Sequence, residues 1–525
     1  MPRLTSTALA LLVVGLAATL GAQDFDLVIR HARIVDGSGA PAISGDLAMR
    51  GDRLAAIGKF AGRGRTEIDA AGRVVAPGFI DVHTHSEDVA ELPVAENFIR
   101  MGVTTIVTGN CGSSKLEVGE FFNAIVQAKV ALNVATLVGH NTVRGQVMGG
   151  SFARPPTAVE LEKMRALVEQ AMKDGAVGLS TGLIYLPGTF AKTDEIVALA
   201  KVAAAHGGIY ASHMRNEGAG ILKALDELTT IAREARIPAE VSHLKLSSPA
   251  AWGRADEIIA YLDRARAAGL TITHDQYAYT ASSTGIGTLI AAEFREGGRK
   301  QYLARLADPA TKARMIAEMK DSIAKGQRGD FTYAVVASFK TDPRLNGKTI
   351  PEAAQLLRGA ATLDDQIETI LDIEARGGAS GVFHGMSEPD LVKFLAQRFT
   401  MIASDAGVRK FGEAVPHPRG YGNNARVLSR YVRELKVLSL EDAVRKMTSL
   451  PAQTFRLKNR GELKPGFVAD VVIFDPAMIS DPSTFVDPHH YAVGFSDVLV
   501  NGVPVIRGGQ LTDARPGRPV KLADL

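Results

Sequence analysis

Eight strand-length apolar segments alternate along this chain with helix-length amphipathic segments, and this alternation constrains the fold most. A strand, a helix and a further strand in succession are typical of a parallel α/β sheet with helices on its faces. Residues 157–173 and 195–206, for example, have helical spacing. Eight repeats favour a closed (β/α)₈ barrel, and no dinucleotide-binding or Walker motif supports an open sheet. The predicted strands are Phe79–Val82, Val103–Val107, Asn133–Val138, Val177–Ser180, Gly208–Ala211, Ala239–Ser242, Thr271–His274 and Met401–Ala403.

Short β-type runs flank this region on both sides, as in Leu27–Ile29 and in the segment 470–474. We therefore predict a small β-sandwich domain built from both termini, residues 23–76 and 455–525, around a barrel of residues 77–454. The seventh predicted strand ends at His274 and the eighth begins only at Met401, which is far beyond a usual barrel connection. The charge-rich, helical stretch of about residues 285–375 is therefore expected to be an inserted subdomain, and a lid is one role for it.

The first residues have the layout of a secretory signal. Arg3 precedes an apolar stretch from Ala8 to Leu20, and the small residues Gly21 and Ala22 follow. This stretch is shorter than the roughly 20 residues that a membrane span needs. We expect a signal peptide over residues 1–22 and a periplasmic or secreted protein. An uncleaved membrane anchor is the alternative, because Leu20 stands where a small residue is preferred before the cleavage site.

The charge balance limits the classes of partner. The chain has 60 basic and 57 acidic residues, which gives a net charge of +3, and no long run has one sign. This balance argues against nucleic acid or an anionic membrane as partner and favours a small-molecule substrate. The single cysteine, Cys111, cannot form an internal disulfide in an exported chain, so it needs another role.

Polar residues follow the predicted strands at the end where barrel enzymes place their active sites. In the pair His83 and His85, the period of two residues directs both imidazoles to the same side. With Cys111, imidazole, thiolate and carboxylate ligands together are typical of zinc. The sequence therefore predicts a zinc site of one or two ions, with Asp405 also acting as the general base on water activated by the metal. The predicted ligands are His83, His85, Cys111, His213, His243 and Asp405.

Several motifs resemble those of a known family. Pro77-Gly-Phe-Ile-Asp-Val-His-Thr-His85 and the segment 461–475 resemble signatures of the amidohydrolase superfamily. From about residue 26 to the C-terminus, the chain is similar to the D-aminoacylases (N-acyl-D-amino-acid deacylases). The more specific motifs are Thr108-Gly-Asn-Cys111, Gly178-Leu-Ser-Thr-Gly-Leu183, His213-Met-Arg-Asn-Glu217, Ser242-His-Leu-Lys245 and His417-Pro-Arg-Gly420.

The resemblance implies roles for individual residues. Cys111, His213 and His243 would hold a tight metal ion, and His83, His85 and Asp405 a weaker one. Lys245, Tyr277 and Arg419 would bind the α-carboxylate of an N-acyl-D-amino acid, although Tyr279 is an alternative to Tyr277. His140 is either an oxyanion donor, a group that supports the site, or an ordinary histidine at a strand end.

Two positions differ from the expected pattern, and three other functions stay open. Ser180 stands where many binuclear members have a carbamylated lysine, which leaves Cys111 as the bridging ligand. Leu244 occupies a position where a polar residue is expected, so the preference for a substrate side chain is not predicted. The expected reaction is hydrolysis of N-acyl-D-amino acids. The alternatives are an exported dipeptidase, a cyclic-amide hydrolase of the dihydroorotase or hydantoinase type, and a non-catalytic binding protein.

Overall fold

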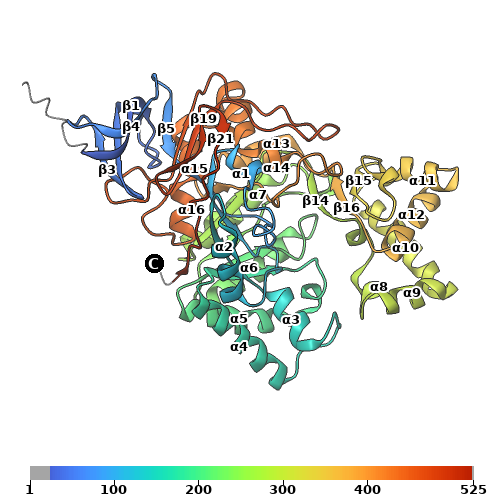
Figure 1. Cartoon of the computed structure of the whole chain (residues 1–525). Helices are drawn as coiled ribbons and strands as arrows, with labels where there is room; N and C mark the ends of the chain where they lie inside the picture. Colours follow the sequence, from blue (N-terminus) through green and yellow to red (C-terminus); the bar gives the residue numbers. More distant parts are fainter. Residues whose placement is uncertain (1–23, 523–525) are drawn as a thin grey trace, which may run out of the picture.

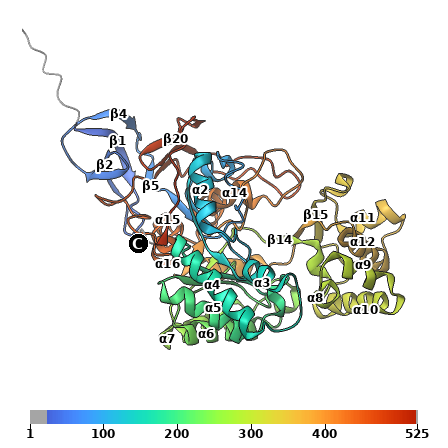
Figure 2. The same cartoon turned by 60° about the horizontal axis from the view of Figure 1, so that its bottom comes forward.

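The computed structural model describes residues 24–522, and the predicted signal peptide lies outside them. The chain forms three parts: a central barrel, a β domain beside it, and a separate unit that extends away from the barrel (Figure 1). The view in Figure 2, turned by 60°, shows the same separation between the β domain and the extending unit. Within residues 24–522, no helix combines the length and apolar character of a membrane span.

The central part contains all eight strands predicted from the sequence, and they run parallel. Hydrogen bonds form two sheets, with the orders β6-β7-β8 and β9-β10-β11-β12-β13-β17. β8 and β9 are separated only by Leu137, and β17 lies beside β6 through the bond from His85 N to Ala406 O (2.9 Å) and the parallel bridge between Thr84 and Ala406. These contacts complete the ring. The strands are β6 (Phe79–Asp81), β7 (Val103–Thr108), β8 (Asn133–Thr136), β9 (Val138–Gly139), β10 (Gly178–Gly182), β11 (Ile209–His213), β12 (Ala239–Val241), β13 (Ile272–Gln276) and β17 (Thr400–Ile402).

Helices connect these strands, and local sequence explains their limits. α4 begins after Thr157, which forms a capping box with Glu160, and ends at Gly175, whose φ of 113° suits glycine. α6 buries Ile221, Leu225 and Leu228 on one face because these residues recur at helical spacing. The helices around the barrel are α1 (Glu96–Ile99), α2 (Val118–Ala128), α3 (His140–Met148), α4 (Ala158–Asp174), α5 (Thr193–Ala205), α6 (Ile221–Ala235), α7 (Ala255–Ala267), α13 (Glu388–Leu395), α14 (Arg419–Arg426), α15 (Leu440–Met447) and α16 (Ser449–Thr454).

The β domain is built from both ends of the chain, as predicted. Its strands form one mixed sheet, in which the N-terminal β5 pairs antiparallel with the C-terminal β18. Residues 517–520 leave this domain and run along β8, where Val134 N bonds to Arg518 O (3.0 Å). The domain strands are β1 (Phe25–Ile34), β2 (Ile43–Arg50), β3 (Arg53–Gly58), β4 (Gly64–Asp69), β5 (Val74–Pro77), β18 (Val471–Phe474), β19 (Phe495–Val500), β20 (Val503–Arg507) and β21 (Gln510–Leu511).

The inserted unit lies between β13 and β17 and has its own hydrophobic cluster. It is wider than the predicted 285–375, because a three-stranded antiparallel sheet of order β14-β16-β15 closes it. Sequence reasoning missed the first of these strands because Ser282-Ser-Thr-Gly285 has only Thr284 among the β-branched and aromatic residues that favour strands. The unit contains β14 (Ser282–Gly285), α8 (Ala292–Arg295), α9 (Arg299–Ala307), α10 (Pro309–Lys325), β15 (Ala334–Ser338), α11 (Ile350–Arg358), α12 (Leu363–Ala375) and β16 (Ser380–Phe383).

Candidate metal centre

The carboxyl ends of the barrel strands bring the six predicted metal ligands to one place. Each follows or ends a different strand, except that His83 and His85 both follow β6. Three groups have ligand atoms within 4.8 Å of one another, namely His83 with Cys111 and His243, His83 with His85 and Asp405, and His213 with Glu217 and His243. The first two groups share His83 and the first and third share His243, so they form one continuous cluster.

Cys111 lies at the centre of three histidines. Its Sγ is 3.3 Å from His83 Nε2, 3.6 Å from His243 Nε2 and 3.7 Å from His213 Nδ1. Burial alone would raise the pKa of the Cys111 thiol, but the charge of His83 and the hydrogen bonds of His213 and His243 more than offset burial and hold this pKa well below its usual value. A thiolate surrounded by imidazole nitrogens is a donor set that suits zinc.

Asp405 joins the cluster from the eighth strand. Its Oδ1 lies 3.2 Å from His85 Nε2 and 3.5 Å from His83 Nε2, and its Oδ2 lies 2.9 Å from Arg419 Nη1. Burial would raise the pKa of the Asp405 carboxyl, yet the charges of Arg419 and His83 hold it well below its usual value. Asp405 is therefore an ionised carboxylate. The side chain of His85 is 37% exposed, so the cluster is open to solvent at this residue.

The backbone at three candidate ligands is strained. Cys111, His243 and Asp405 have φ of 51°, 38° and 53°, in the left-handed region that non-glycine residues rarely adopt. Such conformations persist only where the surrounding contacts hold them. At Cys111 this support comes from Ser180, whose hydroxyl donates to Gly109 O and accepts from Gly112 N (3.0 Å). Ser180 thus holds the turn that presents the thiol.

Sequence reasoning missed two buried carboxylates that contact the histidines from behind. Asp275 Oδ2 lies 3.0 Å from His83 Nδ1, and its Oδ1 accepts from the backbone N–H of His243 (2.9 Å). Glu217 Oε1 lies 3.1 Å from His243 Nδ1. Asp275 is the penultimate residue of the seventh strand, β13, which was predicted to stop at His274, two residues before its end. Glu217 is part of the His213–Glu217 motif but was given no role there.

The three predicted carboxylate-binding residues lie beside the cluster and are buried. Lys245 Nζ is 2.6 Å from Glu217 Oε1, and the Arg419 guanidinium lies over the Tyr277 ring at 4.6 Å. Tyr277 donates its hydroxyl to Met386 Sδ (3.4 Å). Tyr279, the alternative, donates instead to Asp481 Oδ2 (2.6 Å), which lies in the C-terminal segment.

His140 is held apart from the metal cluster. Its Nε2 lies 2.9 Å from Glu195 Oε1, which also accepts from Arg144 Nε (3.0 Å), and its Nδ1 lies 3.4 Å from Asn141 Oδ1. Within residues 24–522, His140 has no hydrogen bond or ion pair with a candidate ligand. Its contacts indicate a structural network between α3 and α5.

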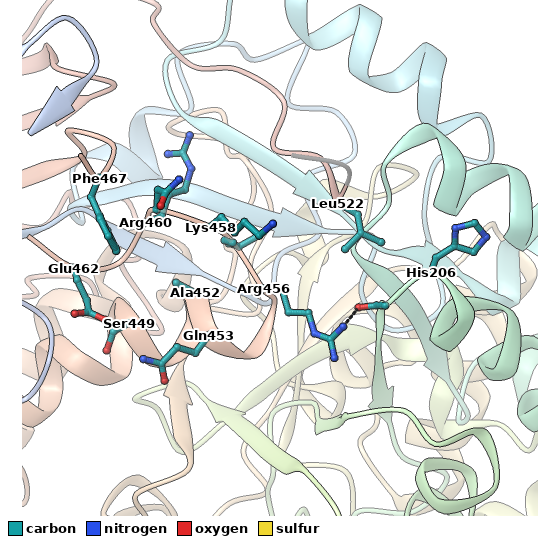
Figure 3. Close-up of a pocket in the computed structure, with 13 residues that line it drawn as sticks. His206, Ser449, Ala452, Gln453, Arg456, Lys458, Arg460, Glu462, Phe467 and Leu522 are labelled. Atoms are coloured by element: carbon teal, nitrogen blue, oxygen red, sulfur yellow. Dashed lines mark hydrogen bonds between the residues drawn. The ribbon is translucent and has the colours of Figure 1, made fainter. Parts of the chain in front are cut away.

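Two cavities differ in their relation to this cluster. One, of about 630 Å³, lies between the loop after β10 and the inserted unit, and Tyr185, Arg295, Lys340 and Glu374 are among its lining residues. Tyr185 connects it to the metal cluster, since its ring centroid lies 4.8 Å from that of His213. The other cavity, of about 580 Å³, lies at the opposite end of the barrel, where Arg456 donates to Gly207 O (Figure 3). None of the candidate ligands lines this second cavity.

The donor groups fit a metal ion. In both His83 and His243, Nε2 faces Cys111 Sγ. The other ring nitrogen, Nδ1, faces a carboxylate, which is Asp275 for His83 and Glu217 for His243. This is the arrangement that orients metal-binding histidines in proteins. The resemblance implied a tight metal site of Cys111, His213 and His243. In the structure, the compact group around Cys111 contains His83 as well as His243.

Comparisons with known proteins agree with this architecture. The amidohydrolase family model matches residues 66–506. D-aminoacylase of Alcaligenes xylosoxydans xylosoxydans is 35% identical over 94% of this chain and 97% of its own length. N-acyl-D-glutamate deacylase of the same organism is 34% identical over 94% and 96%.

Solved structures lead to the same family. A D-aminoacylase crystal structure has a TM-score of 0.80 at 34% identity and covers 95% of this chain and 100% of its own. N-acyl-D-glutamate deacylase of Bordetella bronchiseptica, complexed with zinc and a phosphonate inhibitor, has a TM-score of 0.81 at 33% identity and covers 95% and 99%. An L-hydantoinase from Arthrobacter aurescens shares the fold alone, with a TM-score of 0.54 at 16% identity. The chain therefore belongs to the amidohydrolase family, in its D-aminoacylase branch.

Proposed function

We propose that this protein is a zinc-dependent amidohydrolase that cleaves the amide bond of N-acyl-D-amino acids to a carboxylate and a free D-amino acid. The observation that carries this proposal is the cluster of His83, Cys111, His243, His85 and Asp405 at the carboxyl end of a barrel. Relatives that act on N-acyl-D-amino acids match nearly the whole chain, which supports the same substrate class here.

Zinc held by these residues would polarise the scissile carbonyl and lower the pKa of water. Asp405, ionised and at the mouth of the cluster, accepts the proton of the attacking water and then delivers it to the leaving nitrogen. Arg419 keeps Asp405 ionised through their contact of 2.9 Å. The proton thus moves from water to the amine through a single carboxylate.

The neighbouring cations suit a substrate with a free carboxylate. Lys245, Arg419 and Tyr277 place an ammonium, a guanidinium and a phenol next to the cluster, and we assign them to the substrate's α-carboxylate. The cavity beside Tyr185 provides space for a further part of the substrate. The inserted unit supplies most residues of that cavity, so it takes part in selecting the substrate.

We also infer that the protein is exported. The basic residue Arg3, the apolar stretch from Ala8 to Leu20 and the small residues Gly21 and Ala22 support this inference. Expression of the full chain in a Gram-negative host, followed by fractionation and mass measurement of the N-terminus, tests it. Export with cleavage near Ala22 is expected, and a protein that stays in the cytoplasm at full length would contradict the inference.

The function is tested by the turnover of paired N-acetyl-D- and N-acetyl-L-amino acids. We expect amine release from the D-series, loss of this activity with a chelator, and recovery with added zinc. The substrates include apolar and acidic side chains, because the relatives include enzymes named for glutamate and aspartate. Ring opening of hydantoin or dihydroorotate without turnover of the linear amides would refute the proposal in favour of a cyclic-amide hydrolase.

A further inference from the structure

Glu217 lies between the histidines of the metal cluster and the lysine assigned to the substrate. It is buried, and its carboxylate faces three groups. Glu217 Oε1 is 3.1 Å from His243 Nδ1 and 2.6 Å from Lys245 Nζ, and Oε2 is 3.7 Å from His213 Nε2. Within residues 24–522 the buried His213 Nε2 has no hydrogen-bond partner, and it faces Glu217 Oε2 at 3.7 Å.

The proton positions follow from this geometry. His243 Nε2 faces Cys111 Sγ at 3.6 Å, so this nitrogen offers its lone pair to the metal site. In a neutral ring, Nδ1 then carries the proton and donates it to Glu217 Oε1. His213 has the opposite orientation: its Nδ1 faces Cys111 at 3.7 Å and its Nε2 faces Glu217. Glu217 thus sets the tautomer of His243, and it is also the carboxylate that His213 Nε2 faces.

The same proton assignment determines which hydrogens of Lys245 are free. Lys245 Nζ lies 2.8 Å from His243 Nδ1, but a protonated Nδ1 cannot accept from it. Two of the three ammonium hydrogens go to Glu217 Oε1 and to the backbone O of His243 (3.2 Å). The third hydrogen is left for a ligand, which suits the assignment of Lys245 to the substrate carboxylate.

We propose that Glu217 is a positioning residue that couples the metal site to the substrate-carboxylate site, by orienting His213 and His243 and by holding Lys245. This inference rests on the proposed function for its substrate half only. The metal half concerns the histidines alone and is tested without turnover.

The test is Glu217→Gln, which keeps the shape and removes the charge. We expect a rise of about 10- to 100-fold in the zinc dissociation constant, measured by competition with a chromophoric chelator. With Co²⁺ in place of zinc, we expect an altered visible spectrum. We also expect KM for an N-acyl-D-amino acid to rise roughly ten-fold, because Lys245 loses a charge-assisted hydrogen bond.

Glu195→Gln is the matched control, since Glu195 is a buried glutamate that contacts His140 and Arg144. It is expected to lower stability while leaving zinc affinity and KM unchanged. Glu217→Asp keeps the charge and is expected to give intermediate values, and it replaces Glu217→Gln if that variant does not fold.

A zinc affinity and a KM of Glu217→Gln within two-fold of wild type would overturn the inference. A wild-type protein that binds zinc but releases no D-amino acid would refute the proposed substrate. The zinc titration would still decide the role of Glu217 toward the metal site.

Discussion

Asp405→Asn tests the role of the general base while leaving the other residues of the site in place. The substitution keeps the side-chain shape but removes the group that accepts the proton. A positioned general base contributes about 10²- to 10⁴-fold to a rate, so kcat is expected to fall by that factor, which corresponds to roughly 3–5.5 kcal/mol in the barrier.

The structure predicts a second effect of this substitution, on stability. Arg419 is buried, with 4% of its side chain exposed, and its guanidinium lies 2.9 Å from Asp405. Removing the carboxylate leaves a buried charge without its partner, which costs about 3–5 kcal/mol. The substitution also removes the repulsion between Asp405 and other carboxylates. The stability gained in this way is small by comparison, because the other neighbours of Asp405 are His83 and His85.

A double-mutant cycle with Arg419→Met measures this coupling. The double variant removes both charges, so its free energy of unfolding is expected to recover toward wild type, while kcat stays low. Urea unfolding, steady-state kinetics at saturating substrate and metal analysis of each variant are the assays. If Asp405→Asn binds zinc at the wild-type ratio and keeps kcat within ten-fold of wild type, the reasoning is refuted.

Three further substitutions test other parts of the structure. Cys111→Ser replaces the thiolate at the centre of three histidines, so the variant is expected to lose zinc on dialysis that wild type retains; equal zinc content by metal analysis would contradict this. Asp470→Asn leaves Arg460 without its buried partner between the barrel and the β domain, and we expect urea unfolding to show a loss of about 3–5 kcal/mol, whereas a change below about 1 kcal/mol would argue against the pair. Burial and the charges of Arg266 and Lys446 lower the pKa of His274 to about 3. The folded state therefore binds fewer protons than the unfolded state. The contribution of His274 to stability is fully present above about pH 6.5 and falls as pH falls. From pH 7 to pH 5 this group removes about 2 kcal/mol of stability, and urea unfolding of His274→Gln is expected to lack this component; an equal loss in the variant would show that other groups cause it.

Local patterns in the sequence were sufficient to predict the barrel and to place the candidate metal ligands together at one end of it. The eight strands are apolar because both faces of a parallel sheet are buried, which makes them visible as short runs. Their carboxyl ends must meet at one end of a barrel, so His83, Cys111, His213, His243 and Asp405 could be placed together without coordinates. A small β domain assembled from both termini was predicted from β-type runs at both ends of the chain, and the structure joins the two parts by pairing β5 with β18.

Only the tertiary structure decided which groups lie behind these ligands. Glu217 and Asp275 contact His243 and His83 through distances that depend on the packing of neighbouring strands, and no spacing in the sequence encodes such contacts. The same holds for His140, which has the same strand-end position as the ligands but contacts Glu195 of a helix. A strand pattern fixes the end of the barrel at which a side chain lies, whereas its partners are set by side-chain packing across strands and helices that are distant in the sequence.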